Sequence, residues 1–188
     1  EYYLIMEITK NISQTKLIKS LVVIFLGSIA LTISAKIKIP FYPVPMTMQT
    51  FVVLFLGISF GYKIGLSTVG LYLLEGIVGF PVFSNSPERG VGIIYFTGPT
   101  MGYLIGFLSA SYLASYVCSK DNIVITFIKL SAAVSTIYLL GVIWLGTLIG
   151  WEKPIISLGV TPFLLAEIFK VLLLTLMVKK IIKLRNFI

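Results

Sequence analysis

Hydrophobic residues fall in long runs along this chain, separated by short polar or proline-rich stretches. Because a helix needs about 20 apolar residues to cross the hydrocarbon core of a bilayer, these runs predict transmembrane helices. Six runs can be distinguished, and the second is the weakest. They cover residues 17–37, 47–61, 64–79, 99–117, 123–149 and 162–182. The sequence therefore predicts an all-α integral membrane bundle of six transmembrane helices.

The composition supports a membrane protein. The chain has 188 residues, of which 57% are hydrophobic and 12% are charged. A soluble domain is roughly 45–50% apolar and about 25% charged. A chain of this length cannot hide such an excess of apolar surface in one core. We therefore expect one transmembrane substrate-binding domain over residues 1–188, and we exclude an ordinary soluble enzyme, a disordered chain and a nucleic-acid-binding domain, despite the net charge of +8.

The basic residues predict the orientation in the membrane. With six helices both termini lie on one side, and that side holds ten basic residues: Lys10, Lys16, Lys19, Lys63, Lys120, Lys129, Lys179, Lys180, Lys183 and Arg185. The opposite side holds only Lys36, Lys38, Arg89 and Lys153. Since Lys and Arg are concentrated in cytoplasmic loops, we expect both termini in the cytoplasm and residues 1–16 to form an N-terminal cytoplasmic segment.

The three connections on the outer side differ from the short inner ones. They span residues 39–45, 80–98 and 151–161, and most of the eight prolines lie in them or directly beside them. They also carry aromatic residues, which are unusual in loops that only face solvent. Long irregular loops of this kind usually bind a ligand or cover a site.

Glu167 and Lys170 are the strongest candidates for a binding site. Both lie within an otherwise apolar helix, and at i, i+3 they share one face. Charges at such depth normally face a bundle interior or a polar cavity and are functional by default. The functional interpretation is that Lys170 meets a carboxylate or carbonyl of a ligand while Glu167 accepts from ligand N–H groups. The alternative is a structural ion pair that neutralises itself.

For other polar residues, the sequence leaves open whether their role is structural or ligand binding. Glu75 is the other embedded acid, and it either lines the same cavity or reaches toward the surface. Gln49 opens the second predicted helix beside two threonines. Asn85 and Arg89 lie in the longest outer loop, from which they can reach over a cavity.

The residue inventory excludes several kinds of chemistry. The chain has no histidine and one cysteine, which excludes an intramolecular disulfide, a His- or Cys-based metal site and a Ser-His-Asp catalyst. A phosphate-binding loop of the G-x-x-x-x-G-K-[ST] kind is also missing from the sequence, so the chain cannot hydrolyse ATP alone. We expect no enzyme activity, no metal and no cofactor.

Three motifs occur in order along the chain: IPFYPVPMTMQT at residues 39–50, GFPVF at 79–83 and GPTMGY at 98–103. This ordered set resembles the BioY family, the biotin-specific S components of energy-coupling factor (ECF) transporters. The acid-x-x-Lys step at Glu167 and Lys170 continues the resemblance, which spans nearly the whole chain.

The resemblance implies a function and partners. Such proteins are six-helix subunits of the plasma membrane that capture biotin from outside. Transport then involves a transmembrane coupling protein (the T component) and two cytoplasmic ATPases. Small residues on the first helix contact the coupling subunit in this class, and Ala30 and Ser34 fit the required spacing.

The resemblance also implies site residues. Asn85, Glu167 and Lys170 are the best candidates for ligand contact, followed by Arg89, and we add Gln49, Tyr42 and Tyr103 as further ligand-binding candidates. Two positions depart from the family pattern: Glu167 replaces an aspartate, and Met101 replaces a glycine. The alternatives are an S component for another vitamin, such as riboflavin or thiamine, and an autonomous small secondary transporter or channel.

Overall fold

The computed structural model describes the backbone of residues 2–188 and the side chains from residue 14 onward. Its helices are α1 (Tyr2–Lys36), α2 (Gln49–Val78), α3 (Met101–Ala114), α4 (Ile123–Ile149), α5 (Ile155–Gly159) and α6 (Leu164–Ile181). The short 3₁₀ helices are η1 (Gly92–Thr97), η2 (Thr161–Phe163) and η3 (Ile182–Phe187). Strands β1 (Lys38–Ile39) and β2 (Met46–Thr47) form a small antiparallel hairpin, in which Lys38 pairs with Thr47.

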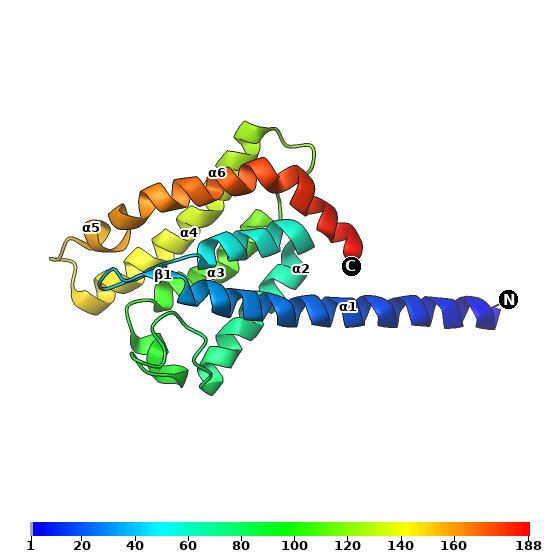
Figure 1. The fold of residues 1–188 in the computed structure, drawn as a ribbon, viewed down its shortest axis with the longest axis horizontal. Coiled ribbons are helices and arrows are strands. Elements are labelled where there is room, and N and C mark those ends of the chain that lie inside the picture. Colours follow the sequence, from blue (N-terminus) through cyan, green and yellow to red (C-terminus); the bar gives the residue numbers. More distant parts are fainter. Residues whose placement is uncertain (1) are drawn as a thin grey trace.

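The structure confirms the predicted all-α bundle of six helices. α2 covers two of the predicted helices, 47–61 and 64–79, and the other four correspond to α1, α3, α4 and α6. α2 is broken at Gly61, where φ is 77° and ψ is 177°. Figure 1 shows that the two halves of α2 run in different directions. Four helical stretches are long and apolar enough to cross a membrane: Gln14–Lys36, Gln49–Val78, Ile123–Ile149 and Ile155–Phe187. α3 is apolar but shorter.

The break at Gly61 gives a stability prediction. Its backbone conformation is one that only glycine adopts readily, so Gly61→Ala is expected to destabilise the fold by about 1–3 kcal/mol. Gly70 is the matched control, since it lies inside α2 and a methyl group added there would meet open space; alanine at this position is expected to be neutral or stabilising by about 0.5–1 kcal/mol. Thermal unfolding of the two variants in detergent measures this difference, and equal melting temperatures would contradict it.

The bundle packs most closely between α3 and α4. A Cβ atom added at Gly106 would lie 2.6 Å from the Cα of Ile137, so the two backbones touch at this point. On the same helix Ala110 and Ala114 are fully buried. Small residues allow such close approach, which is how helices associate where no hydrophobic driving force acts between them.

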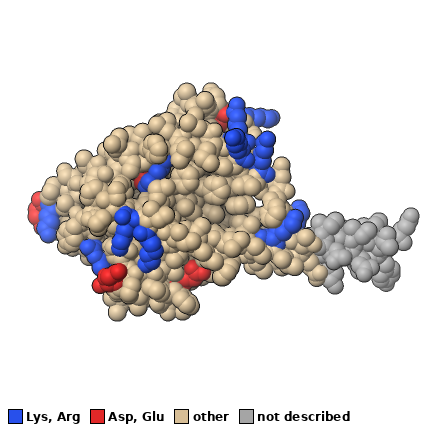
Figure 2. All heavy atoms as spheres, viewed as in Figure 1, with Lys and Arg blue, Asp and Glu red and all other residues tan. Residues whose placement is uncertain are grey.

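The two ends of the bundle differ in character. Figure 1 shows both chain ends on one side, while the hairpin, η1 and α5 gather at the opposite end. A hydrogen bond of 3.2 Å from Lys19 Nζ to the Phe187 carbonyl joins the C-terminal segment to α1. Figure 2 shows Lys and Arg side chains concentrated toward the two ends, with few charged atoms between them. This distribution fits a bundle whose middle faces lipid.

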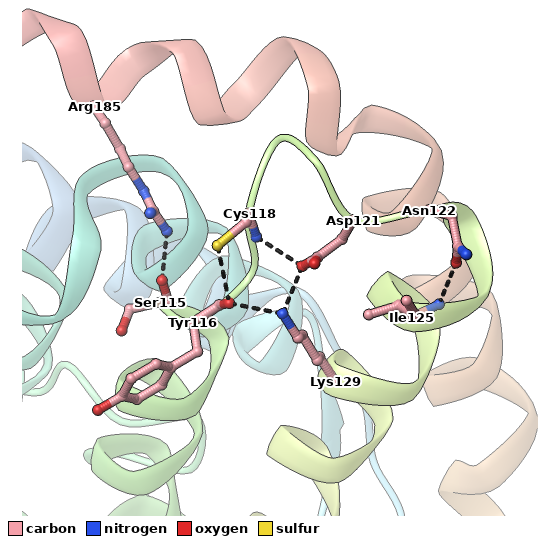
Figure 3. A network of polar contacts seen from close by, with 8 residues as sticks. All are labelled: Ser115, Tyr116, Cys118, Asp121, Asn122, Ile125, Lys129 and Arg185. Atoms are coloured by element: carbon pink, nitrogen blue, oxygen red, sulfur yellow. Dashed lines mark hydrogen bonds and ion pairs between the residues drawn. The ribbon is translucent and has the colours of Figure 1, made fainter.

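A polar network closes the end of the bundle that carries the chain ends (Figure 3). Lys129 Nζ lies 2.7 Å from Asp121 Oδ2 in the connection between α3 and α4. This hydrogen bond from Lys129 lowers the pKa of Asp121. Arg185 donates to the carbonyls of Ile58 and Ser115, each at 2.7 Å. The guanidinium therefore ties η3 to α2 and to the end of α3.

Candidate functional site

A cavity lies at the end of the bundle opposite the chain ends. Its wall is formed by the segment 44–50, by residues of α3 and α4, and by the side chains of Ser84, Phe163 and Glu167. It holds ≈ 540 Å³ of space between its wall atoms, including the part open to solvent. Only ≈ 50 Å³ is wide enough for the centre of a water molecule. A vitamin-sized ligand therefore has to move these walls apart.

Glu167 and Lys170 form a buried ion pair at the base of this region. Both residues are 5% exposed, and Lys170 Nζ lies 2.8 Å from Glu167 Oε1. The ammonium also donates to the Thr47 carbonyl at 2.6 Å and to Thr50 Oγ1 at 3.0 Å. Thr50 in turn donates to Glu167 Oε1 at 2.8 Å. Since an ammonium has three protons, Lys170 is saturated by acceptors of its own chain.

The two members of this pair face different spaces. Glu167 lines the cavity. Lys170 lines a separate apolar groove, between the β1–β2 hairpin, the start of α2 and α6. Glu167 Oε2 is buried and has no hydrogen-bond partner among the described residues. A carboxylate oxygen can only accept hydrogen bonds. The Tyr138 hydroxyl, which also lines the cavity, interacts with this carboxylate, so Tyr138 and a donor on a ligand are the groups that can approach it.

Gln49 is part of the wall, and both ends of its amide have partners. It is 4% exposed. Its Nε2 donates to the Tyr72 hydroxyl at 2.7 Å, and its Oε1 accepts from Thr47 Oγ1 at 3.2 Å. Tyr72 then donates to the Val82 carbonyl at 3.2 Å. This chain of hydrogen bonds fixes the start of α2 against the loop that follows it.

Tyr103 also lines the cavity, where it joins α3 to α5. Its hydroxyl donates to the Gly159 carbonyl at 2.9 Å. Its ring lies against Gly141, since a Cβ added there would come within 2.4 Å of a ring atom. α5 lies in a stretch for which the sequence predicts an irregular loop, and the hydrogen bond to Gly159 joins it to Tyr103 in the cavity wall.

Asn85 and Arg89 lie beside the cavity and do not line it. They border a smaller pocket together with Tyr95, Gly98, Pro99 and Thr100. Asn85 Oδ1 accepts from Lys38 Nζ at 3.0 Å. Arg89 donates to the Pro43 carbonyl at 2.9 Å, and its guanidinium lies 5.4 Å from the centre of the Tyr42 ring. Tyr42 itself is 80% exposed and is not part of the cavity wall.

The remaining candidates lie on α1 and α2. Glu75 does not line the cavity, and both of its oxygens accept from Ser28 Oγ, at 2.7 and 2.9 Å. It therefore links α2 to α1. Ser34 is 4% exposed, and its hydroxyl donates to the Leu31 carbonyl. Ala30 is partly exposed, so of the two residues predicted to contact a partner only Ala30 offers substantial surface.

Three polar residues of this region were not among the predicted site residues: Thr47 and Thr50 were noted only as the threonines beside Gln49, and Ser84 was missed. Thr50 connects the ion pair to α2, Thr47 supplies the carbonyl that binds Lys170, and Ser84 lines the cavity. Thr47 and Thr50 lie within the 39–50 motif, which is the one signal that could have identified them. Ser84 has an ordinary loop composition around it and carries no such signal.

Comparisons with known proteins show the family of this chain. A model of the BioY family matches residues 7–187. A probable biotin transporter BioY of Pyrococcus horikoshii is 36% identical, over 80% of this chain and 87% of the relative. The biotin transporter BioY of Thermotoga maritima is 32% identical, over 82% and 90% of the two chains.

A solved structure has the same fold. It is a crystal structure of the S-component for biotin from an ECF-type ABC transporter, with a TM-score of 0.74 and 24% identity. The match covers 90% of this chain and 93% of the other. The resemblance seen in the motifs is thus confirmed by the family match and by the curated relatives: this chain belongs to the BioY family.

Proposed function

We propose that this chain is the biotin-binding S component of an ECF transporter in the plasma membrane. The observation that carries the proposal is the buried Oε2 of Glu167 in the cavity wall, which accepts no hydrogen bond from the residues that the structure describes. Membership of the BioY family supports it, as do the names of the curated relatives, which are biotin transporters.

The chemistry of biotin suits the wall of this cavity. Biotin has two ureido N–H donors, a ureido carbonyl, an apolar sulfur ring and a valerate carboxylate. Ligand sites are usually apolar with a few placed polar groups. Here Tyr103, Phe107, Tyr138 and Phe163 supply aromatic surface, and Glu167 supplies an acceptor for ureido N–H groups.

The proposed orientation has both termini in the cytoplasm and the cavity at the outer face. The excess of basic residues at the end that carries the chain ends supports it. In this orientation the hairpin, η1 and α5 lie at the outer end of the bundle. Lys10 belongs to the predicted cytoplasmic segment 1–16, but its side chain lies outside the residues that the structure describes.

Binding to purified protein tests the proposed ligand. Labelled biotin titrated onto the chain in detergent is expected to bind saturably at one site, and unlabelled biotin is expected to displace it. Riboflavin and thiamine are not expected to compete. If riboflavin or thiamine bound more tightly than biotin, the proposed ligand would be wrong and that vitamin would take its place in the proposal. Uptake driven by an ion gradient into liposomes that contain this chain alone would instead support an autonomous transporter.

Delivery of biotin into the cell is proposed to require a transmembrane coupling protein and two cytoplasmic ATPases. Ala30→Trp is expected to leave biotin binding unchanged and to abolish uptake by cells that express the whole transporter, because a bulky ring would block close helix contact at this partly exposed position. Ala132→Trp, at an exposed position of α4, is the control and is expected to preserve uptake. Loss of binding by Ala30→Trp would place Ala30 in the chain's own core.

A further inference from the structure

Four side-chain oxygens are buried without a hydrogen-bond partner among the described residues. They belong to Ser59, Ser84, Ser111 and Glu167. Buried polar groups are nearly always paired, so each calls for an explanation. Ser59 and Ser111 lie on α2 and α3 and do not line the cavity, whereas Ser84 and Glu167 both line it. Ser84 is only 5% exposed.

The backbone that carries Ser84 is fixed by two lysines. Lys38 Nζ donates to the Ser84 carbonyl at 2.6 Å. Lys36 Nζ donates to the carbonyls of Phe83 at 2.7 Å and of Ser86 at 2.8 Å. These bonds bind the loop on both sides of Ser84, while its hydroxyl is left without a partner among the described residues. The hydroxyl is therefore held in place at the wall of the cavity.

The charges around this loop favour an acceptor as the partner of Ser84. Lys36, Lys38 and Arg89 all donate to carbonyls at or beside the loop. The only acid in the same loop is Glu88, which is exposed. Nearby positive charges stabilise an oxygen that carries negative charge, and a hydroxyl can donate a hydrogen bond to such an oxygen.

We propose that Ser84 is a ligand-binding residue that donates a hydrogen bond to an oxygen of the ligand, while Glu167 accepts from its N–H groups. This inference rests on the proposed function of the cavity. The ligand must then carry both an acceptor oxygen and N–H donors. Biotin has two such oxygens, the ureido carbonyl and the carboxylate, and either can be the partner.

Biotin titrations with Ser84→Ala test the proposal. Loss of one hydrogen bond is expected to weaken binding about three- to tenfold. Ser59→Ala removes an equally unpartnered buried hydroxyl outside the cavity and is expected to leave affinity unchanged. Thermal unfolding shows whether each variant is folded. If Ser84→Ala unfolds, Ser84→Cys is used in its place, because cysteine preserves the size of the side chain.

Two analogues identify the oxygen that Ser84 contacts. One is 2-thiobiotin, in which sulfur replaces the ureido oxygen, and the other ends in a methyl group instead of the carboxylate. The penalty of Ser84→Ala is expected to disappear for one of them. Wild-type affinity of a folded Ser84→Ala variant, or an equal penalty with biotin and both analogues, would overturn the inference. Failure of the wild-type chain to bind biotin would instead overturn the proposed function.

Discussion

Replacing Glu167 by glutamine is expected to weaken biotin binding by about tenfold to 150-fold. Hydrogen bonds to charged groups contribute about 1.5–3 kcal/mol, and each 1.4 kcal/mol is about a factor of ten in affinity. Glutamine keeps the size of the side chain, and its remaining oxygen can still accept from Lys170 and Thr50. Its NH₂ group then takes the position of Oε2, where a donor would face the N–H donors of the ligand.

Glu75→Gln is the matched control for this experiment. Glu75 is the other acid within the helical stretches that are long and apolar enough to cross a membrane, but its oxygens accept from Ser28, and it does not line the cavity. We expect this variant to bind biotin with wild-type affinity. An unchanged affinity of Glu167→Gln, or an equal loss in both variants, would show that Glu167 does not contact the ligand.

Lys170→Met is expected to destabilise the protein by about 3–5 kcal/mol, because removing one member of a buried ion pair leaves the other uncompensated. The lysine has three acceptors within its own chain and lines the groove outside the cavity. We therefore expect weaker biotin binding as a consequence of a displaced Glu167 carboxylate. Thermal unfolding in detergent measures the stability change directly.

A double variant separates the structural role of the pair from its binding role. Glu167→Leu combined with Lys170→Met removes both charges, and apolar replacement of a buried pair is often neutral or stabilising. The double variant is expected to recover most of the stability that Lys170→Met loses, and to remain unable to bind biotin. A Lys170→Met variant as stable as the wild type would contradict the structural role of the lysine.

The features that could be predicted from the sequence are those that depend on residues close together along the chain. Apolar runs identified the helices, and the i, i+3 spacing placed Glu167 and Lys170 on one face of α6. What the spacing left open was the partner of each charge. Lys170 is held by Thr47 and Thr50, which are more than 100 residues away along the chain. Only the tertiary fold decides that the lysine is bound within the chain, while Oε2 of the glutamate accepts no hydrogen bond from the described part of the chain.

The loops were the least predictable part of the site. Asn85 lies in the loop between α2 and α3 as expected, yet its amide oxygen is bound by Lys38, 47 residues earlier in the chain. Ser84, its neighbour, lines the cavity instead. Which of two adjacent loop residues faces inward depends on backbone conformation, and here that conformation is set by Lys36 and Lys38. No periodic pattern in the sequence indicates such contacts.

A crystal structure of the chain with biotin is the most direct test of the proposed site. We expect the ligand to lie within the cavity, with a ureido nitrogen within hydrogen-bond distance of Glu167 Oε2 and Lys170 still bound to Thr47. Biotin seated in the apolar groove beside Lys170, or in the cavity without contact to Glu167, would contradict this assignment.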